Sequence, residues 1–258
     1  MNNTTPVERR QWMAMCAASA VGIALSSGCA SAQNTPAFPG IPATPASSTL
    51  NATQLAIVPI AAFSAAGDMP KLNSALNQGL DAGLTISEAR EVLVQLYAYA
   101  GFPRSLNALS ELMRVANERK QRGVHDAPGR APARPIPKGD ALLAAGTANQ
   151  TRLSGAPVQG PLFDFAPVAN EYLRSHLFGD IFERDNLDWH SREVATVSML
   201  AAIAGVESQL QSHMRISMNI GLTAPQLRQL TQVLAERVDA QSASRAQSAL
   251  ERHLASVR

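Results

Sequence analysis

An internal repeat constrains the fold of this 258-residue chain more than any other feature of its sequence. A constant shift along the chain, the repeat offset, carries Gly67 onto Gly205 and the segment 83–85, Gly-Leu-Thr, onto an identical segment at 221–223. Glycine and threonine at such positions are typical of helix ends, where a left-handed residue closes one helix and a hydroxyl caps the next. We therefore predict an all-α fold that contains two repeated helical cores.

Cap residues and apolar periodicity place the expected helices. They are predicted over residues 51–66, 69–82, 85–100, 104 onward, 140–152, 168–182, 189–204, 206–220, and from 223 towards the chain end. Pro59 should kink the first helix or delay its start. The predicted organisation is an export signal (1–32), a disordered tether (33–48), a first repeat (49–121), a Pro/Gly-rich linker with a short helix (122–162) and a second repeat (163–258).

Composition excludes several classes of function. The chain is 46% hydrophobic and 16% charged, which is typical of a globular protein. Its formal net charge is +2 and aromatic residues make up 5%, without a basic stripe, so we expect no nucleic-acid partner. The sequence also contains no phosphate loop, dinucleotide fingerprint or nucleophile elbow, and its histidines lack the spacing of a metal site, so neither a metal nor a cofactor is expected.

The N-terminal segment resembles an export signal. Arg9 and Arg10 precede a short apolar stretch, 13–25, and Ala30-Ser31-Ala32 fits a signal-peptidase site. The adjacent arginines also fit a twin-arginine signal, so a twin-arginine and a general secretory route both remain open. A lipoprotein signal ending at Cys29 is a further alternative, and only that alternative would attach the protein to a membrane. We expect a periplasmic or otherwise exported protein.

The two cysteines, Cys16 and Cys29, both precede the predicted cleavage site. The predicted mature chain therefore lacks a thiol and can form neither a disulfide nor a reactive thiolate.

Two stretches resemble a known family. Residues 91–109 read EVLVQLYAYAGFPRSLNAL and residues 205–223 read GVESQLQSHMRISMNIGLT. Both resemble characteristic stretches of the carboxymuconolactone decarboxylase family, which includes the alkylhydroperoxidase D-like peroxidases. The resemblance implies an alkylhydroperoxidase D-like helical bundle, a homo-oligomer (trimer or hexamer), and a cofactor-free lyase acting on a small carboxylated or lactone substrate.

His213 is the central candidate for catalysis. It shares a helix face with Val206, Leu210 and Ser217, so it should be buried. A core histidine without a catalytic role would be buried in the same way, and this alternative stays open. In the family a histidine before the Gly-Leu-Thr segment acts as an acid or base, a role that suits an imidazole. Glu193, inside an apolar run, resembles the family's glutamate and would pair with His213, although a first-turn glutamate can simply favour the helix dipole.

The remaining candidates are weaker. Glu207 resembles the decarboxylase spacing, but a negative charge is also favourable at a helix start. Arg104 could bind a substrate carboxylate bidentately, and Asn107 and Tyr97 belong to the same segment, which borders the substrate cavity in the family. The first repeat has Ala75 where the second has His213, so we hypothesise a composite site that joins His213 to the turn 101–107.

Cysteine positions separate the two branches of the family. The peroxidase branch has cysteines seven and four residues before its histidine, and here those positions are Val206 and Gln209. The sequence therefore favours the lyase. A peroxidase and a non-catalytic envelope binding protein remain as alternatives.

Overall fold

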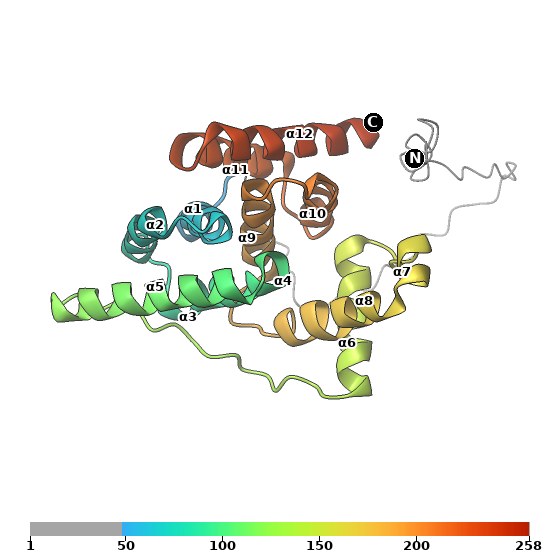
Figure 1. Ribbon diagram of the computed structural model, residues 1–258, viewed down its shortest axis with the longest axis horizontal. Coiled ribbons are helices and arrows are strands. Elements are labelled where there is room, and N and C mark those ends of the chain that lie inside the picture. The colour runs from blue at the N-terminus through green and yellow to red at the C-terminus, as the bar shows by residue number, and fades with distance from the viewer. Residues whose placement is uncertain (1–47, 258) are drawn as a thin grey trace, which may run out of the picture. The chain divides into compact units, whose positions relative to one another are not determined.

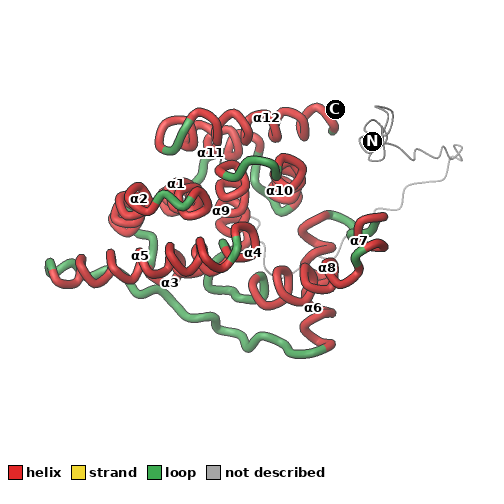
Figure 2. Tube along the Cα trace, in the orientation of Figure 1, coloured by secondary structure: helices red, strands yellow, loops and turns green. Residues whose placement is uncertain are grey.

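The computed structural model describes residues 48–257. The predicted export signal, and the predicted tether except for its last residue, therefore lie outside the described residues. Within 48–257 all regular secondary structure is helical and no strand is present, as Figure 2 shows. The prediction of an all-α fold is confirmed for this part of the chain.

Four segments form the N-terminal half of the fold. They are α1 (Ala52–Ala66), α2 (Met69–Asp81), α3 with the short α4 (Ile86–Gln95, Tyr97–Ala100) and α5 (Phe102–Gln121). Asn51 and Thr85 each form a capping box with the residue three positions on. Helix α1 runs through Pro59 from Ala52, so the proline does not delay the start of the helix.

Four helices also form the C-terminal half: α9 (Trp189–Ala202), α10 (Glu207–Asn219), α11 (Ala224–Arg237) and α12 (Ala240–Ser256). We expected one helix from residue 223 to the chain end, and this was wrong. Val238 leaves the helical conformation, and the side chain of Asp239 accepts a hydrogen bond from the Ser242 N–H, which begins a new helix.

The repeat offset also relates the helices of the two halves. The shift that carries Gly67 onto Gly205 carries both ends of α2 onto the ends of α10, and the first residues of α3 and α5 onto those of α11 and α12. The linking glycines agree as well, since Gly67 and Gly205 have φ angles of 79° and 84°. The helix ends and the conformation of the linking glycines therefore recur at one offset in the described chain.

Helices α1 and α9 pack against each other at the centre of this arrangement. Helices α11 and α12 lie on one side of them, and α3 and α5 on the other (Figure 1). Both central helices are buried on nearly all faces, which explains why neither has a clear polar stripe. Two charged residues near the start of α9, Arg192 and Glu193, are also 0% exposed.

The segment between the halves contains α6 (Asp140–Ser154), α7 (Pro161–Phe165), α8 (Pro167–Tyr172) and a π-helix (Leu173–Ile181). We expected one continuous helix over 168–182, but its second part has the wider π-helical turn. Gly146 of α6 packs directly on this turn, because a Cβ at Gly146 would lie 1.7 Å from the Arg174 carbonyl oxygen. Such π-helical segments occur frequently at functional sites.

Candidate functional site

A histidine and a glutamate meet between α9 and α10. The Nδ1 atom of His213 lies 2.8 Å from Oε2 of Glu193, and this glutamate is fully buried. Asp188 caps the start of α9 and so helps to set the position of Glu193 one turn later. The His213 side chain keeps 11% of its surface exposed, and its Nε2 atom has no hydrogen-bond partner within residues 48–257. Nε2 is therefore the atom that can meet a ligand.

Glu193 itself, Tyr99 and Ser217 of the same helix as His213 carry buried polar atoms without partners in the described chain. Among the described residues nothing hydrogen-bonds to the buried atoms Glu193 Oε1, Tyr99 Oη or Ser217 Oγ. The Tyr99 ring approaches the His213 ring edge-on, with centroids 5.7 Å apart. Buried polar atoms are nearly always paired in proteins, so a cluster of unpaired ones indicates a place that a polar ligand can complete.

Tyr99 remains a neutral hydrogen-bond donor at neutral pH. Burial raises the pKa of its hydroxyl, and the negative charge of Glu193 raises that pKa further. A phenol in this state donates a proton in a hydrogen bond without ionising. Tyr99 comes from the N-terminal half and His213 from the C-terminal half, so the site is built from both.

A second buried network lies on the neighbouring face of α9. Arg192 donates to Glu91 Oε2 at 3.1 Å, to Gln95 Oε1 at 3.2 Å and to a backbone carbonyl. Arg184 adds a bidentate pair to the same Glu91 carboxylate. These contacts tie α3 to α9 and hold the helix that carries Glu193.

The carboxylate of this network is stabilised in its charged form. Burial raises the pKa of Glu91, but the hydrogen bond from Arg184 and the charge of Arg192 outweigh burial and lower that pKa to about 2. Burial also lowers the pKa of Arg192, and the Glu91 carboxylate opposes this lowering. Its hydrogen bonds join α3 to α9 and to Arg184, which precedes α9, and this indicates a structural role; Arg192 Nε is a buried atom of the network without a partner among the described residues.

The other predicted residues lie elsewhere. Glu207 is exposed and accepts a hydrogen bond from the Gly205 N–H at 3.1 Å, the arrangement expected of an acidic residue at a helix start. Hydrogen bonds from backbone N–H groups, including that of Gly205, lower the pKa of Glu207. Its described contacts do not include the His213–Glu193 pair.

No described hydrogen bond or ring contact joins the predicted turn 101–107 to His213. Arg104 is exposed, and its guanidinium lies against Gly67 at the end of α1, about 3.9 Å from where a Cβ would be. Asn107 is also exposed and forms no side-chain hydrogen bond within the described chain. Tyr97 stacks on Phe102 with centroids 4.3 Å apart, so it belongs to a neighbouring aromatic cluster.

Two features of the site were not predicted from the sequence. Tyr97 was the predicted residue, whereas Tyr99 contacts His213; spacing shows that the two rings diverge but not which one faces α10. The Glu91–Arg192 network was also not predicted. A usable signal was present, because Glu91 with Gln95 and Arg192 with Thr196 are pairs of polar residues four positions apart, and so each pair shares one face of its helix.

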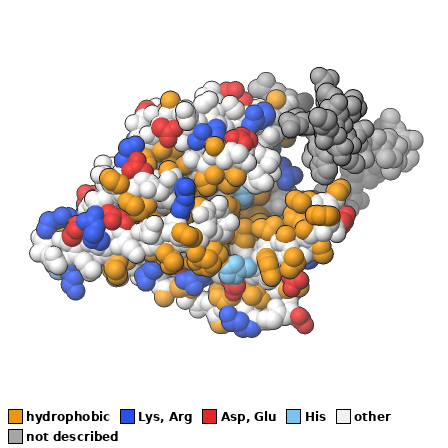
Figure 3. Space-filling model, viewed as in Figure 1, with side chains coloured by type: hydrophobic (Ala, Val, Ile, Leu, Met, Phe, Trp, Pro, Cys, Tyr) orange, Lys and Arg blue, Asp and Glu red, His pale blue; other side chains and the backbone are white. Residues whose placement is uncertain are grey.

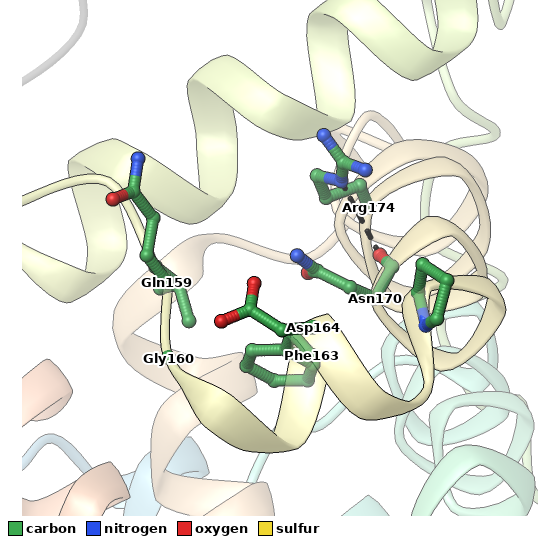
Figure 4. A pocket seen from close by; sticks show the side chains of 8 residues that line it. Gln159, Gly160, Phe163, Asp164, Asn170 and Arg174 are labelled. Atoms are coloured by element: carbon green, nitrogen blue, oxygen red, sulfur yellow. Dashed lines mark hydrogen bonds between the residues drawn. The ribbon is translucent and has the colours of Figure 1, made fainter.

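A separate cavity of about 630 Å³ lies at the start of α7 and α8. Figure 4 shows the Asp164 carboxylate pointing towards the Asn170 amide, while the Arg174 guanidinium points away from both. Arg174 Nε donates to the Asn170 carbonyl at 3.4 Å. None of the residues predicted for catalysis lines this cavity.

No group of three or more His, Cys, Asp or Glu within the described chain could hold a metal ion. None of its helices has the length and apolar character needed to cross a membrane. His176 pairs with Asp180 at 2.7 Å on the surface, and His190 Nε2 lies 2.7 Å from the Ile220 carbonyl.

Large hydrophobic side chains are exposed on α5, α7 and α8: Phe102, Leu106, Met113, Leu162, Phe165, Val168 and Tyr172. Figure 3 shows hydrophobic side chains gathered around a hollow on this face, with histidine side chains visible beside it. Exposed apolar groups in such number are typical of a surface that contacts another molecule.

Comparison with known proteins does not assign the chain to a family, since no family model matches its sequence and no curated protein is detectably similar to it.

Proposed function

We propose that the protein is a cofactor-free lyase that acts on a small carboxylated or lactone substrate, with an alkylhydroperoxidase D-like fold and His213 as the general acid or base. The observation that carries this proposal is the buried His213–Glu193 pair, with Nε2 of the histidine free. The stretches that resemble the decarboxylase family supply the class of substrate.

Glu193 orients the imidazole. By accepting a hydrogen bond from Nδ1–H, its carboxylate fixes the tautomer that leaves a lone pair on Nε2, and it stabilises the cation that forms when Nε2 takes up a proton. A carboxylate held this way acts on the substrate only through the histidine, so Glu193 is a positioning residue.

The proposed reaction needs only one proton carrier. The bond between the substrate carbon and its carboxylate breaks, carbon dioxide leaves, and the electron pair moves into the substrate's own conjugated lactone carbonyl. Protonated His213 then delivers its Nε2 proton to that carbon, and it regains a proton from water. The Tyr99 hydroxyl is the donor that would stabilise negative charge on the substrate oxygen.

The test is to incubate the full chain with carboxymuconolactone and related lactone acids and to measure released carbon dioxide. We expect His213→Ala to lower kcat by about 10²- to 10⁴-fold, the usual contribution of a general acid or base. His176→Ala is the matched control, because that histidine also pairs with a carboxylate but lies on the surface. Equal turnover by wild type and His213→Ala would rule out the proposed role.

Two alternatives have weaker support. A thiol peroxidase needs cysteines where this chain has Val206 and Gln209. A non-catalytic binding protein is favoured by the absence of a histidine at Ala75, and it predicts ligand binding without turnover. Hydroperoxide consumption by the full chain would support the peroxidase. Binding of lactone acids without release of carbon dioxide would support the binding protein.

We also propose that the protein assembles as a homo-oligomer through the exposed hydrophobic side chains of α5, α7 and α8. Light scattering coupled to size-exclusion chromatography should give a mass that is a multiple of the 27.3 kDa chain, or of the shorter chain that remains if the proposed export signal is removed. Phe165→Asp, at a side chain that is 88% exposed, should lower that mass without unfolding the chain. A monomeric wild type would contradict this part of the proposal.

A further inference from the structure

A cavity in the N-terminal half occupies the place that corresponds to the His213 site. Its volume is about 520 Å³, and it lies between α1, α2 and the last residue of α11. The repeat offset relates its lining residue Ala75 to His213, and relates Tyr99 to its lining residue Arg237. Tyr99 contacts His213 at one of these two places, and at the other a cavity lies beside Arg237.

Two cations line this cavity. Arg237 donates from Nη2 to Gln78 Oε1 at 2.7 Å, and no carboxylate of the described residues pairs with it. Lys71 lies 5.5 Å from the centroid of the Phe63 ring and 3.1 Å from Asp68 Oδ2. Asp68 offsets one of the two positive charges, so the charge of Arg237 remains available to an anion. Its guanidinium is held at one nitrogen, which prepares the others to receive a carboxylate.

The cavity also has an apolar lining. Pro59, Phe63 and Ala75 contribute it, and Ser74 adds a hydroxyl. The volume lies within the range of small-molecule sites, which combine an apolar wall with a few polar groups. No histidine, aspartate or glutamate lines the cavity, so it offers no group that titrates near neutral pH for proton transfer.

We infer that this cavity binds a small organic anion, with its carboxylate on Arg237 and Lys71 and its apolar body against Phe63, and that it does not convert the bound molecule. This site is separate from His213, and it does not depend on the proposed lyase activity.

Benzoate is a suitable probe, because it combines one carboxylate with a flat apolar ring. Isothermal titration of the full chain should show benzoate binding that is at least about tenfold tighter than binding of uncharged benzamide, and Arg237→Gln should weaken benzoate by a similar factor. Arg228→Gln is the matched control: it removes the same charge from an exposed position of the same helix, outside the cavity. Equal affinity for Arg237→Gln and Arg228→Gln would overturn the inference.

The place of binding can be read directly. In methyl-labelled alanine spectra the Ala75 signal should shift on addition of benzoate, and it should still shift in His213→Ala. Arg237→Lys should recover part of the lost affinity, because it restores the charge but not the bidentate geometry. A benzoate response that disappears in His213→Ala and persists in Arg237→Gln would place the anion at the other site and refute this one.

Discussion

The two halves of the molecule share a helical framework and differ in the polar groups that they hold at corresponding points. In the C-terminal half, α9 and α10 bury a glutamate against a histidine. In the N-terminal half the corresponding positions are Leu55 and Ala75, and two cations stand at the edge of a cavity instead. Two halves can therefore keep the same helix caps and differ in the polar side chains that they bury. The caps depend on residues close together in the sequence, whereas a site depends on only a few side chains.

The largest predicted difference between the halves concerns the buried ion network. Glu91→Ala would leave Arg192, which is 0% exposed, without its carboxylate, and we expect this to lower the free energy of unfolding by about 3–5 kcal/mol. The corresponding residue, Gln229, accepts one hydrogen bond from the Leu50 N–H, so Gln229→Ala should cost only about 1 kcal/mol. Urea denaturation of both variants measures the difference, and equal losses would contradict the asymmetry.

Acid should weaken the same network. The folded-state pKa of Glu91 is about 2, below its ordinary value of 4.5, so folding favours the ionised form. The resulting stabilisation, about 3 kcal/mol, is complete above about pH 4.5 and is lost as the pH falls towards 2. Chemical denaturation between pH 2 and pH 6 should show this slope, and Glu91→Gln should flatten it. A slope that is unchanged in Glu91→Gln would assign the acid sensitivity to other groups.

The shared framework predicts equal effects at equivalent glycines. Gly67 and Gly205 both have positive φ angles, and no atom lies closer than 3.9 Å to the position of an added Cβ at either. Gly67→Ala and Gly205→Ala should therefore each lower the free energy of unfolding by about 1–2 kcal/mol, the cost of a left-handed residue with a Cβ. Thermal unfolding of the pair tests the equivalence, which fails if one substitution is neutral.

The smallest expected change in stability is at the two tyrosines of α4. Each has a buried hydroxyl without a partner among the described residues, so Tyr97→Phe and Tyr99→Phe should each be neutral or stabilise by up to about 1 kcal/mol. Turnover should separate them: only Tyr99 contacts His213, so only Tyr99→Phe should lower kcat, by severalfold. Equal kcat values for the two variants would remove Tyr99 from the proposed site.

Much of the helical framework could be predicted because its signals are local. The capping boxes at Thr85 and Thr223 and the glycines that close helices identify the helix ends within a few residues of chain. The π-helix at 173–181 was not predicted, because the close approach of Gly146 that accompanies it comes from a distant helix. The break at Val238 was also missed, although Asp239 is a good cap residue.

The site was predictable in part. Burial of His213 follows from helical spacing, and a carboxylate inside the apolar run of α9 requires a partner, so the pairing with Glu193 was a sound expectation. Arg104, Asn107 and Tyr97 were chosen from the same short segment, yet the structure brings none of their side chains into a described contact with His213. The position of a residue near a turn does not show where its side chain points, because the side chains of consecutive helical residues point about 100° apart.

The sequence by itself determined most of the helices, the recurrence of their cap residues at one constant offset, and the absence of cysteine after Cys29. These properties depend on interactions between residues that are near in the chain. Tertiary packing alone decided that Tyr99 faces His213, that Arg192 is paired with Glu91, and that a cavity opens beside Arg237. Those outcomes depend on how α1 and α9 pack and on which faces of the surrounding helices then meet, and a local sequence pattern can mark a polar residue as notable without identifying its distant partner.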